Sequence, residues 1–139
     1  MSKLTAEELA AMPDKQRKNP RTVRLYHDHD YMTAYALHTD MRVAEQGYRA
    51  AVGATADWDR HGELQLNFLR AQGLRPEHSL LEIGCGTGRL ARRVVPYLRP
   101  ASYVGVDISR GALDSARQLA TEEGWAREMP AFFHDISRL

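Results

Sequence analysis

The pattern of hydrophobic and polar positions changes about halfway along the chain. From residue 79 onward, short apolar runs alternate with longer stretches whose apolar residues share one helical face. These runs predict strands at residues 79–83, 102–106 and 131–134, because a short apolar run bounded by polar residues is typical of a buried strand. Strands that alternate with helices are usually parallel and joined by right-handed crossovers. We therefore expect an α/β fold with a parallel sheet of about three strands.

Two helices are expected between these strands. The first covers residues 89–98 and is kinked or closed near Pro96, because proline disfavours the interior of a helix. The second begins after Ser109, whose side chain is a suitable N-cap. The apolar side of the first helix carries Leu90, Val94, Val95 and Leu98. The apolar side of the second carries Ala112, Leu113, Ala116, Leu119 and Ala120.

The residues before the first strand are expected to be mainly helical. Residues 5–12 predict a short helix with Thr5 as its N-cap and Glu8 as the partner in a capping box. Residues 13–24 are polar and basic, and they predict a mobile linker or arm. One or two helices are expected over residues 31–52, which are rich in alanine, tyrosine and methionine.

A more strongly patterned helix is expected over residues 58–72. Its apolar face would carry Leu64, Phe68 and Ala71. We accordingly divide the chain into an N-terminal helical segment with a basic arm, residues 1–56, and a partial sheet domain, residues 57–139.

Composition limits the classes of protein that the chain can represent. Its 139 residues suffice for one domain, and 43% hydrophobic and 27% charged residues suit a globular protein. The formal net charge is +1, so bulk charge does not favour nucleic acid. The N-terminus has no apolar signal core, and no apolar run is long enough for a membrane span. We therefore expect a cytoplasmic protein.

The most informative motif follows the first predicted strand. Glu82 is succeeded by Gly84, Gly86 and Gly88 at intervals of two, and a helix is expected directly afterwards. Glycine permits a sharp strand-to-helix turn and lets a ligand approach the backbone. A helix N-terminus adds unpaired N–H groups and partial positive charge, which suit nucleotides and carboxylates. A dinucleotide fingerprint would need glycine in place of Arg89, and a phosphate-binding P-loop would need a lysine.

Together with two later acids, this loop resembles the first motif of the class I S-adenosylmethionine-dependent methyltransferases. Asp107 ends the second predicted strand, 25 residues after Glu82, and Asp135 ends the third, 28 residues later. Each interval accommodates one helix and one strand. The resemblance covers roughly residues 59–139 and implies a Rossmann-like sheet that binds S-adenosyl-L-methionine.

The resemblance implies a role for each residue of the motifs. Asp107 would accept hydrogen bonds from both ribose hydroxyls, and Ile108 would lie against the adenine ring. Asp135 would meet the adenine amino group, Glu82 would hold the methionine amino group, and the loop backbone would reach the methionyl end. The cofactor-binding residues expected in this way are Glu82, Gly84, Cys85, Gly86, Gly88, Asp107, Ile108 and Asp135.

The reaction implied is methyl transfer to an acceptor. We expect this acceptor to be a small molecule in preference to a nucleic acid. The protein would align the acceptor with the methyl group. No catalytic base can be assigned, although His27 and His134 are candidates by residue type. Cys85 is expected to be a small buried residue, because a reactive thiol needs an activating neighbour that the motif does not supply.

Two further groups of residues have simple interpretations. His and Asp alternate from His27 to Asp30, but alternating ligands face opposite sides, so we expect a polar loop and no metal site. Aromatic residues near the N-terminus could either cover the cofactor or pack against the sheet. They are Tyr26, Tyr31, Tyr35 and Trp58.

The resemblance implies about seven strands with the first in the interior, whereas the pattern predicts about three, which would leave the first strand at an edge. The N-terminal helices could cover this edge, or a homodimer or partner chain could complete the sheet. The chain could also be an inactive remnant. Three functions therefore stay open: a methyltransferase, a non-catalytic cofactor-binding or interaction module, and a remnant. An oxidoreductase is disfavoured by Arg89.

Overall fold

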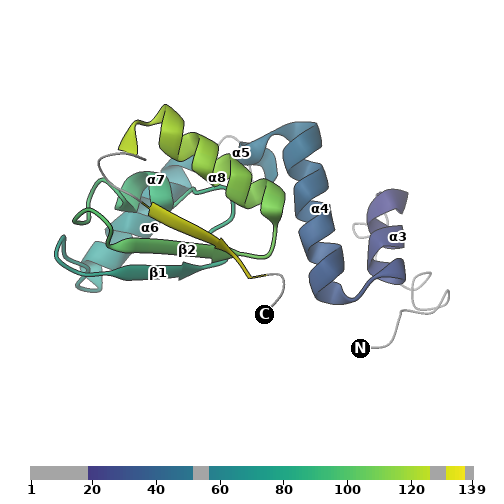
Figure 1. Cartoon of the computed structure of the whole chain (residues 1–139), viewed down its shortest axis with the longest axis horizontal. Helices are drawn as coiled ribbons and strands as arrows, with labels where there is room; N and C mark the ends of the chain where they lie inside the picture. The colour runs from purple at the N-terminus through teal and green to yellow at the C-terminus, as the bar shows by residue number, and fades with distance from the viewer. Residues whose placement is uncertain (1–18, 52–56, 126–130, 137–139) are drawn as a thin grey trace.

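A computed structural model describes residues 19–51, 57–125 and 131–136 (Figure 1). The predicted helix over residues 5–12 lies outside these ranges. In chain order the elements are α3 (Pro20–Asp28), α4 (Tyr31–Gln46), α5 (Tyr48–Ala51), α6 (Trp58–Ala71), β1 (Leu80–Ile83), α7 (Ala91–Val94), β2 (Tyr103–Asp107), α8 (Arg110–Glu122) and β3 (Ala131–Asp135).

The three strands form a parallel sheet in the order β1-β2-β3, which confirms the predicted α/β fold. In register, Leu80 pairs with Tyr103 and Ile83 pairs with Val106. Within the described residues β1 is an edge strand, as expected. The helices α7 and α8 lie on one face of the sheet (Figure 1). On β1, Leu81 and Ile83 are 60% and 76% exposed, so its opposite face is uncovered by the described residues.

The core lies between the sheet and α8. Ser109 caps this helix as predicted, because its side chain accepts a hydrogen bond from the Ala112 N–H. All five residues of the predicted apolar face are buried: Ala112, Leu113, Ala116, Leu119 and Ala120. Tyr103 of β2 is buried beneath them and belongs to the same cluster.

The helix predicted over residues 89–98 is shorter than expected. Only Ala91–Val94 is α-helical, and turns flank it on both sides. Hydrogen bonds between residues three apart, such as that from the Tyr97 N–H to the Val94 carbonyl, are mixed there with helical bonds between residues four apart, and Pro96 supplies no N–H. The four predicted apolar residues, Leu90, Val94, Val95 and Leu98, are nevertheless buried.

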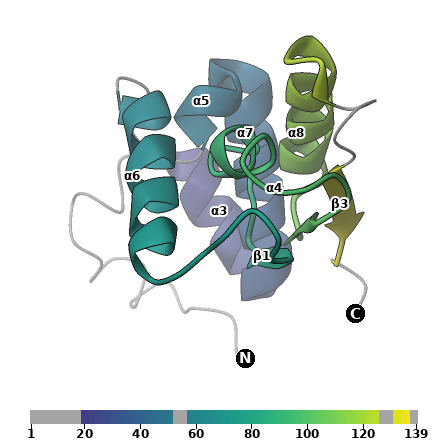
Figure 2. The same cartoon turned by 90° about the vertical axis from the view of Figure 1, so that its left-hand side faces the viewer.

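The helix α6 matches its predicted range, but the prediction of its buried face was wrong. Leu64 and Phe68 are 52% and 64% exposed, whereas Trp58 and Gly62 are buried. A Cβ on Gly62 would lie 2.6 Å from the Arg89 carbonyl oxygen. The glycine therefore lets α6 dock closely against the Arg89 carbonyl, on the side that also buries Trp58. Figure 2 shows α6 beside α7, on the side away from α8.

The predicted linker over residues 13–24 is partly wrong, because Pro20–Asp28 forms the helix α3. Its N-cap Asn19 accepts a hydrogen bond from the Arg21 N–H, and Pro20 occupies a first-turn position that suits proline. Arg21 also pairs with Glu45 of α4 at 2.8 Å. Basic residues of this segment therefore belong to a helical surface.

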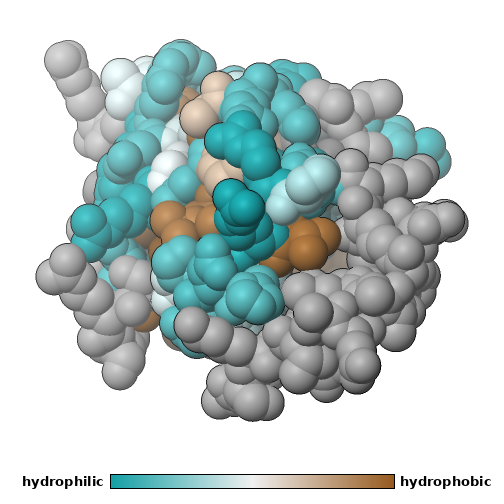
Figure 3. All heavy atoms as spheres, turned by 90° about the vertical axis from the view of Figure 1, so that its right-hand side faces the viewer, coloured by the Kyte–Doolittle hydropathy of each residue, from teal (hydrophilic) through white to brown (hydrophobic). Residues whose placement is uncertain are grey.

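The predicted polar loop at His27 to Asp30 is likewise partly helical. His27 and Asp28 end α3, and Asp30 caps α4 by accepting hydrogen bonds from the backbone and hydroxyl of Thr33. The helix α4 then packs against α8 and α5, so it stands beside the sheet (Figure 1). Seen from the side of α3 and α4, the described surface is mainly hydrophilic, with an apolar area near its centre (Figure 3).

Candidate cofactor-binding site

The glycine loop after β1 is tied to the end of β2. Gly84 and Gly86 have φ angles of +77° and +55°, which side chains rarely adopt. The N–H groups of Gly84 and Cys85 both donate to the Val106 carbonyl, at 2.8 and 3.1 Å. The loop therefore turns back over the neighbouring strand immediately after β1 ends.

Gly88 has a packing role in this loop. Its φ angle is +88°, and a Cβ there would lie 3.3 Å from the Ala116 Cβ and 3.4 Å from Leu119. Gly88 thus allows α8 to pack tightly against the loop. It does not line the cavity described below, so the structure separates it from Gly84 and Gly86.

Asp107 is the central polar group at this end of the sheet. It is 8% exposed, and its two carboxylate oxygens accept hydrogen bonds from the N–H groups of Gly86 (2.8 Å) and Ser109 (2.9 Å). A carboxylate offers about four acceptor positions, so about two remain for a ligand. These backbone donors orient the carboxylate and keep it attached to both the loop and α8.

Glu82 is a second, partly buried carboxyl group near this end of the sheet. Burial raises the pKa of its carboxyl to about 7, although a hydrogen bond from Tyr103 and the charge of Arg89 act in the opposite direction. The Tyr103 hydroxyl donates to Glu82 Oε2 at 2.6 Å. Near neutral pH, Glu82 is therefore divided between its neutral and charged forms.

Cys85 is buried, as predicted. Burial raises the pKa of its thiol to about 12, so the thiol is protonated at neutral pH. Its sulfur packs over Gly105, where a Cβ would approach the Cys85 Sγ to 2.9 Å and the Tyr103 Oη to 2.8 Å. A neutral, packed thiol cannot act as a nucleophile.

A cavity of about 580 Å³ lies between the carboxyl ends of the strands and α4. Its volume falls in the ~300–1,000 Å³ range of small-molecule sites. It is lined by Met32, Tyr35, Thr39, Arg42, Ala51, Ile83, Gly84, Gly86, Arg89, Asp107, Ile108 and Ile136. The structure thus gathers four of the predicted site residues around one space: Gly84, Gly86, Asp107 and Ile108.

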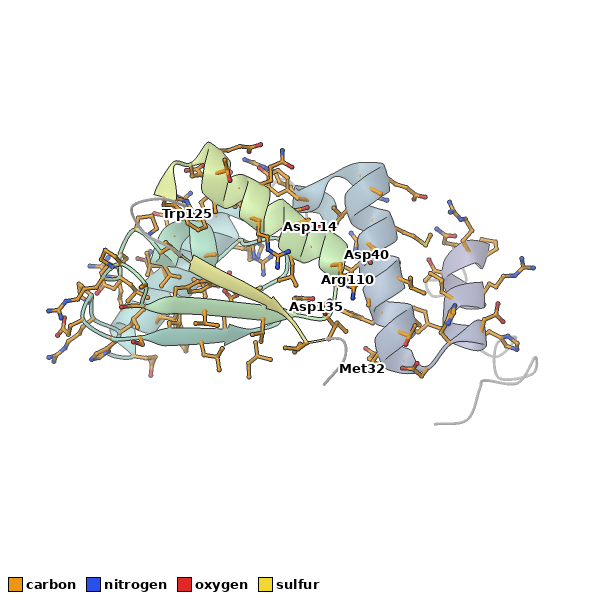
Figure 4. All side chains as sticks on the ribbon, viewed as in Figure 1. Met32, Asp40, Arg110, Asp114, Trp125 and Asp135 are labelled. Atoms are coloured by element: carbon orange, nitrogen blue, oxygen red, sulfur yellow. The ribbon has the colours of Figure 1, made fainter. Side chains whose placement is uncertain are left out.

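Each of the other predicted residues is a sequence neighbour of a residue that lines the cavity, but does not line the cavity itself. Besides Glu82, Cys85 and Gly88, this applies to Asp135, whose carboxylate accepts a 2.8 Å hydrogen bond from Arg110 Nε. Figure 4 shows Arg110 and Asp135 side by side near the end of β3. The next residue, Ile136, does line the cavity.

Sequence reasoning missed most of the wall that α4 contributes. Met32, Tyr35, Thr39 and Arg42 follow at intervals of three, four and three residues, which places them on one face of a helix. The spacing could have shown that they share a face. Their mixed chemistry concealed it, because a search for apolar faces passes over a threonine and an arginine.

The aromatic residues divide between the two roles left open for them. Tyr35 lines the cavity, while Trp58 is 1% exposed in the core and contacts Tyr48 edge-on. Tyr31 stacks on Tyr35 with ring centroids 6.1 Å apart, and its other neighbour is Tyr26 at 5.9 Å.

Two kinds of feature are absent from the described ranges. Residues 19–51, 57–125 and 131–136 contain no group of three His, Cys, Asp or Glu side chains that could hold a metal ion. The helices in these ranges also include none that is both long and apolar enough to cross a membrane.

Known proteins with similar sequences include methyltransferases. Residues 81–136 match the family model described as "Methyltransferase domain". A stretch of 46 residues is 44% identical to malonyl-[acyl-carrier protein] O-methyltransferase from Brevibacillus brevis, and it covers 33% of this chain and 16% of that protein.

A solved methyltransferase structure shares the fold. Magnesium protoporphyrin IX methyltransferase from Synechocystis, with bound SAH, aligns at a TM-score of 0.55 and 20% identity, over 76% of this chain and 53% of that one. The YcgJ protein from Bacillus subtilis aligns at a TM-score of 0.44 and 29% identity, over 54% of this chain and 30% of that one. The chain thus spans about half the length of these relatives, or less.

The fold and the glycine loop define an α/β domain of the Rossmann-like type. Residues 81–136 match the methyltransferase-domain model, which confirms the predicted resemblance to the class I methyltransferases, and a solved methyltransferase structure shares the fold.

Proposed function

We propose that this chain carries the S-adenosylmethionine-binding half of a methyltransferase that acts on a small molecule. The observation that carries the proposal is Asp107, held by the N–H groups of Gly86 and Ser109 at the edge of the cavity. Its remaining acceptor positions suit two adjacent hydroxyl groups, such as those of a ribose. A charged acceptor of this kind contributes about 1.5–3 kcal/mol per hydrogen bond.

The residues around Asp107 fit the rest of the cofactor. A Cβ on Gly84 would meet no atom within 4 Å, so the loop leaves open space beside its backbone. Ile108 and Ile136 supply an apolar lining that suits the adenine ring. We assign the glycine loop, including Gly88 and the Cys85 backbone, to the methionyl end, as the resemblance implies.

Glu82 and Asp135 keep their proposed roles at the two ends of the cofactor. Glu82 would reach the methionine amino group through water, since its own carboxylate is bonded to Tyr103. Asp135 would reach the adenine amino group on release from Arg110, which holds it at 2.8 Å. The cost of breaking this exposed pair is small.

The cofactor brings its own reactive group, a methyl on a sulfonium, so the protein need only bind and align. The chain's own residues would hold the ribose at Asp107 and leave the cavity beside α4 for the acceptor. Bringing two reactants together in this way replaces an encounter in solution with an oriented approach. We assign no catalytic base.

The acceptor is proposed to be a small molecule. The cavity wall on α4 combines Met32 and Tyr35 with the guanidinium of Arg42, which suits an apolar body bearing an anionic group. The net charge of +1 offers no broad field for nucleic acid. The printed names of two relatives, a malonyl-carrier and a porphyrin methyltransferase, are consistent with such an acceptor.

A second candidate function is a cofactor-binding or interaction module completed by a partner chain. The exposed edge and uncovered face of β1, with Leu81 and Ile83, favour it. Parallel sheets are usually covered on both faces. We keep the proposed division at residues 1–56 and 57–139 in both cases, with α4 of the first segment forming a wall of the site in the second.

Calorimetric titration of the purified protein with S-adenosylhomocysteine, with light scattering on the same sample, tests these proposals. Saturable binding by a monomer supports the methyltransferase site in one chain. Binding that appears only in a dimer, or only with added partner, supports the module. A folded, soluble protein that does not bind by itself contradicts the methyltransferase site in one chain and leaves the partner-dependent module and the remnant.

A further inference from the structure

Asp40, in the middle of α4, reaches the first turn of α8 (Figure 4). Its Oδ1 accepts a 2.6 Å hydrogen bond from the Ser109 hydroxyl and a 2.9 Å hydrogen bond from the Gly111 N–H. The first N–H groups of a helix have no partner inside it, and the helix dipole favours a carboxylate there. Asp40 therefore caps a helix that lies about 70 residues later in the chain.

Ser109 carries this contact onward to the candidate site. Its hydroxyl donates to Asp40 and accepts from the Ala112 N–H at 3.0 Å, while its own N–H donates to Asp107 Oδ1 at 2.9 Å. The other oxygen of Asp107 accepts from Gly86 in the glycine loop. Ser109 is fully buried, so it cannot replace these partners with bulk water.

Gly111 shows how closely the two helices approach at this point. A Cβ on Gly111 would lie 3.0 Å from Asp40 Oδ1 and 3.4 Å from the Asp40 Cα. Even a methyl group would press on the carboxylate and on the backbone of α4. The geometry of Asp40 therefore depends on a glycine opposite it.

We propose that Asp40 is a positioning residue for cofactor binding, which acts through Ser109 to hold Asp107 toward the cavity. This inference rests on the proposed function, in which Asp107 receives the ribose. The helix α4 also supplies the cavity wall that contains Tyr35 and Arg42. The contact of Asp40 with α8 therefore sets the position of that wall relative to the rest of the cavity. Docking of α4 onto α8 and binding of the cofactor in the cavity are then coupled, so that each favours the other.

Variants of the full chain test the inference in titrations with S-adenosylhomocysteine. Asp40→Ala should weaken binding about five- to tenfold, at the lower end of usual coupling between sites. Asp40→Asn should lose less, because its amide oxygen can still accept from Ser109 and Gly111. Gly111→Ala should weaken binding by displacing Asp40. Glu45→Gln is the matched control, since it removes an exposed carboxylate of α4 that pairs with Arg21 instead.

A double-mutant cycle separates positioning from general loss of structure. If Asp40 acts through Asp107, Asp40→Ala should cost little further affinity in an Asp107→Ala background. An equal loss in both backgrounds would overturn the inference, as would unchanged affinity in the single variants. If Asp40→Ala does not fold by circular dichroism, Asp40→Asn and Gly111→Ala take its place in the cycle.

Amide hydrogen exchange measured without ligand tests the positioning role of Asp40 independently of the proposed function. Asp40→Ala should speed exchange of the Gly86 and Ser109 amides, whose common acceptor is Asp107, while Glu45→Gln leaves them unchanged. A wild-type protein that fails to bind S-adenosylhomocysteine would contradict the proposed function. Unaltered exchange at both amides would contradict the positioning role of Asp40 in that case too.

Discussion

The Tyr103 hydroxyl donates a 2.6 Å hydrogen bond to Glu82, joining the central strand β2 to the strand that leads into the glycine loop. The two residues lie on adjacent strands, on the face that α8 covers. Burial raises the pKa of both groups, so the carboxyl and the phenol are each more readily neutral than in water. This pair couples the stability of the sheet to pH beside the candidate site.

Glu82→Gln should reduce the pH dependence of stability. The folded pKa of Glu82 is about 7 and its ordinary value is 4.5, so between these values the folded state binds more protons than the unfolded state. The contribution of Glu82 is fully present below pH 4.5 and is lost as pH rises through about 7. Denaturant unfolding across this window should show a wild-type free energy that falls with pH relative to the variant. A constant difference between the two proteins would contradict the assigned pKa.

Tyr103→Phe should destabilise the fold most at alkaline pH. It removes the donor that lowers the pKa of Glu82, so a half-buried carboxylate loses its partner. Leaving such a group unsatisfied costs about 1–3 kcal/mol. Unfolding experiments should show a smaller loss below the pKa of Glu82, where the carboxyl is neutral. The double variant with Glu82→Gln is the control and should recover part of the stability.

Asp107→Ala should weaken binding of S-adenosylhomocysteine roughly ten- to a hundredfold, which corresponds to about 1.4–2.8 kcal/mol. The ribose would lose its charged acceptor, and the Gly86 N–H would lose its partner. Calorimetry measures the affinity, and circular dichroism checks that helix content is retained. Asp114→Ala removes an exposed acid of α8 and should bind as the wild type does. Equal affinities for the wild type and Asp107→Ala would refute the site.

Gly84→Ala should abolish or strongly weaken binding, and Gly73→Ala should not. Both glycines have positive φ angles, +77° and +99°, and neither Cβ would meet an atom within 4 Å. Both substitutions therefore cost about 1–2 kcal/mol of backbone strain. Of these two glycines, only Gly84 lines the cavity. Thermal unfolding should show similar losses for the two variants, while titration separates them. Similar affinities would mean that the loop backbone does not face the ligand.

Local patterns predicted the sheet half of the chain well because they report local physics. The alternation of apolar runs and helical faces from residue 79 onward is confirmed by β1, β2 and β3 and by the five buried residues of α8. The N-cap at Ser109 also followed from the sequence, since a cap is made within one turn. The acid at the end of β2 could be recognised for the same reason.

Contacts between distant elements escaped prediction. Gly62 lets α6 approach the Arg89 carbonyl closely, while Leu64 and Phe68, which the sequence placed on the apolar face, stay exposed. Arg42 and Asp40 gain their places in the site only through the packing of α4 against α8. Gly88 occurs in the motif with Gly84 and Gly86, yet it serves packing against Ala116.

The sequence by itself determined the order of strands and helices from residue 79 onward, the glycine loop and the acid Asp107, because backbone torsion, periodicity and capping are set by neighbouring residues. Only the tertiary structure decided which of these residues share a cavity, and it added α4 as the opposite wall. That wall depends on a close approach at Gly111 and a hydrogen bond from Ser109 to Asp40. Contacts across such a separation in the chain form only when the helices pack, so no local pattern contains them.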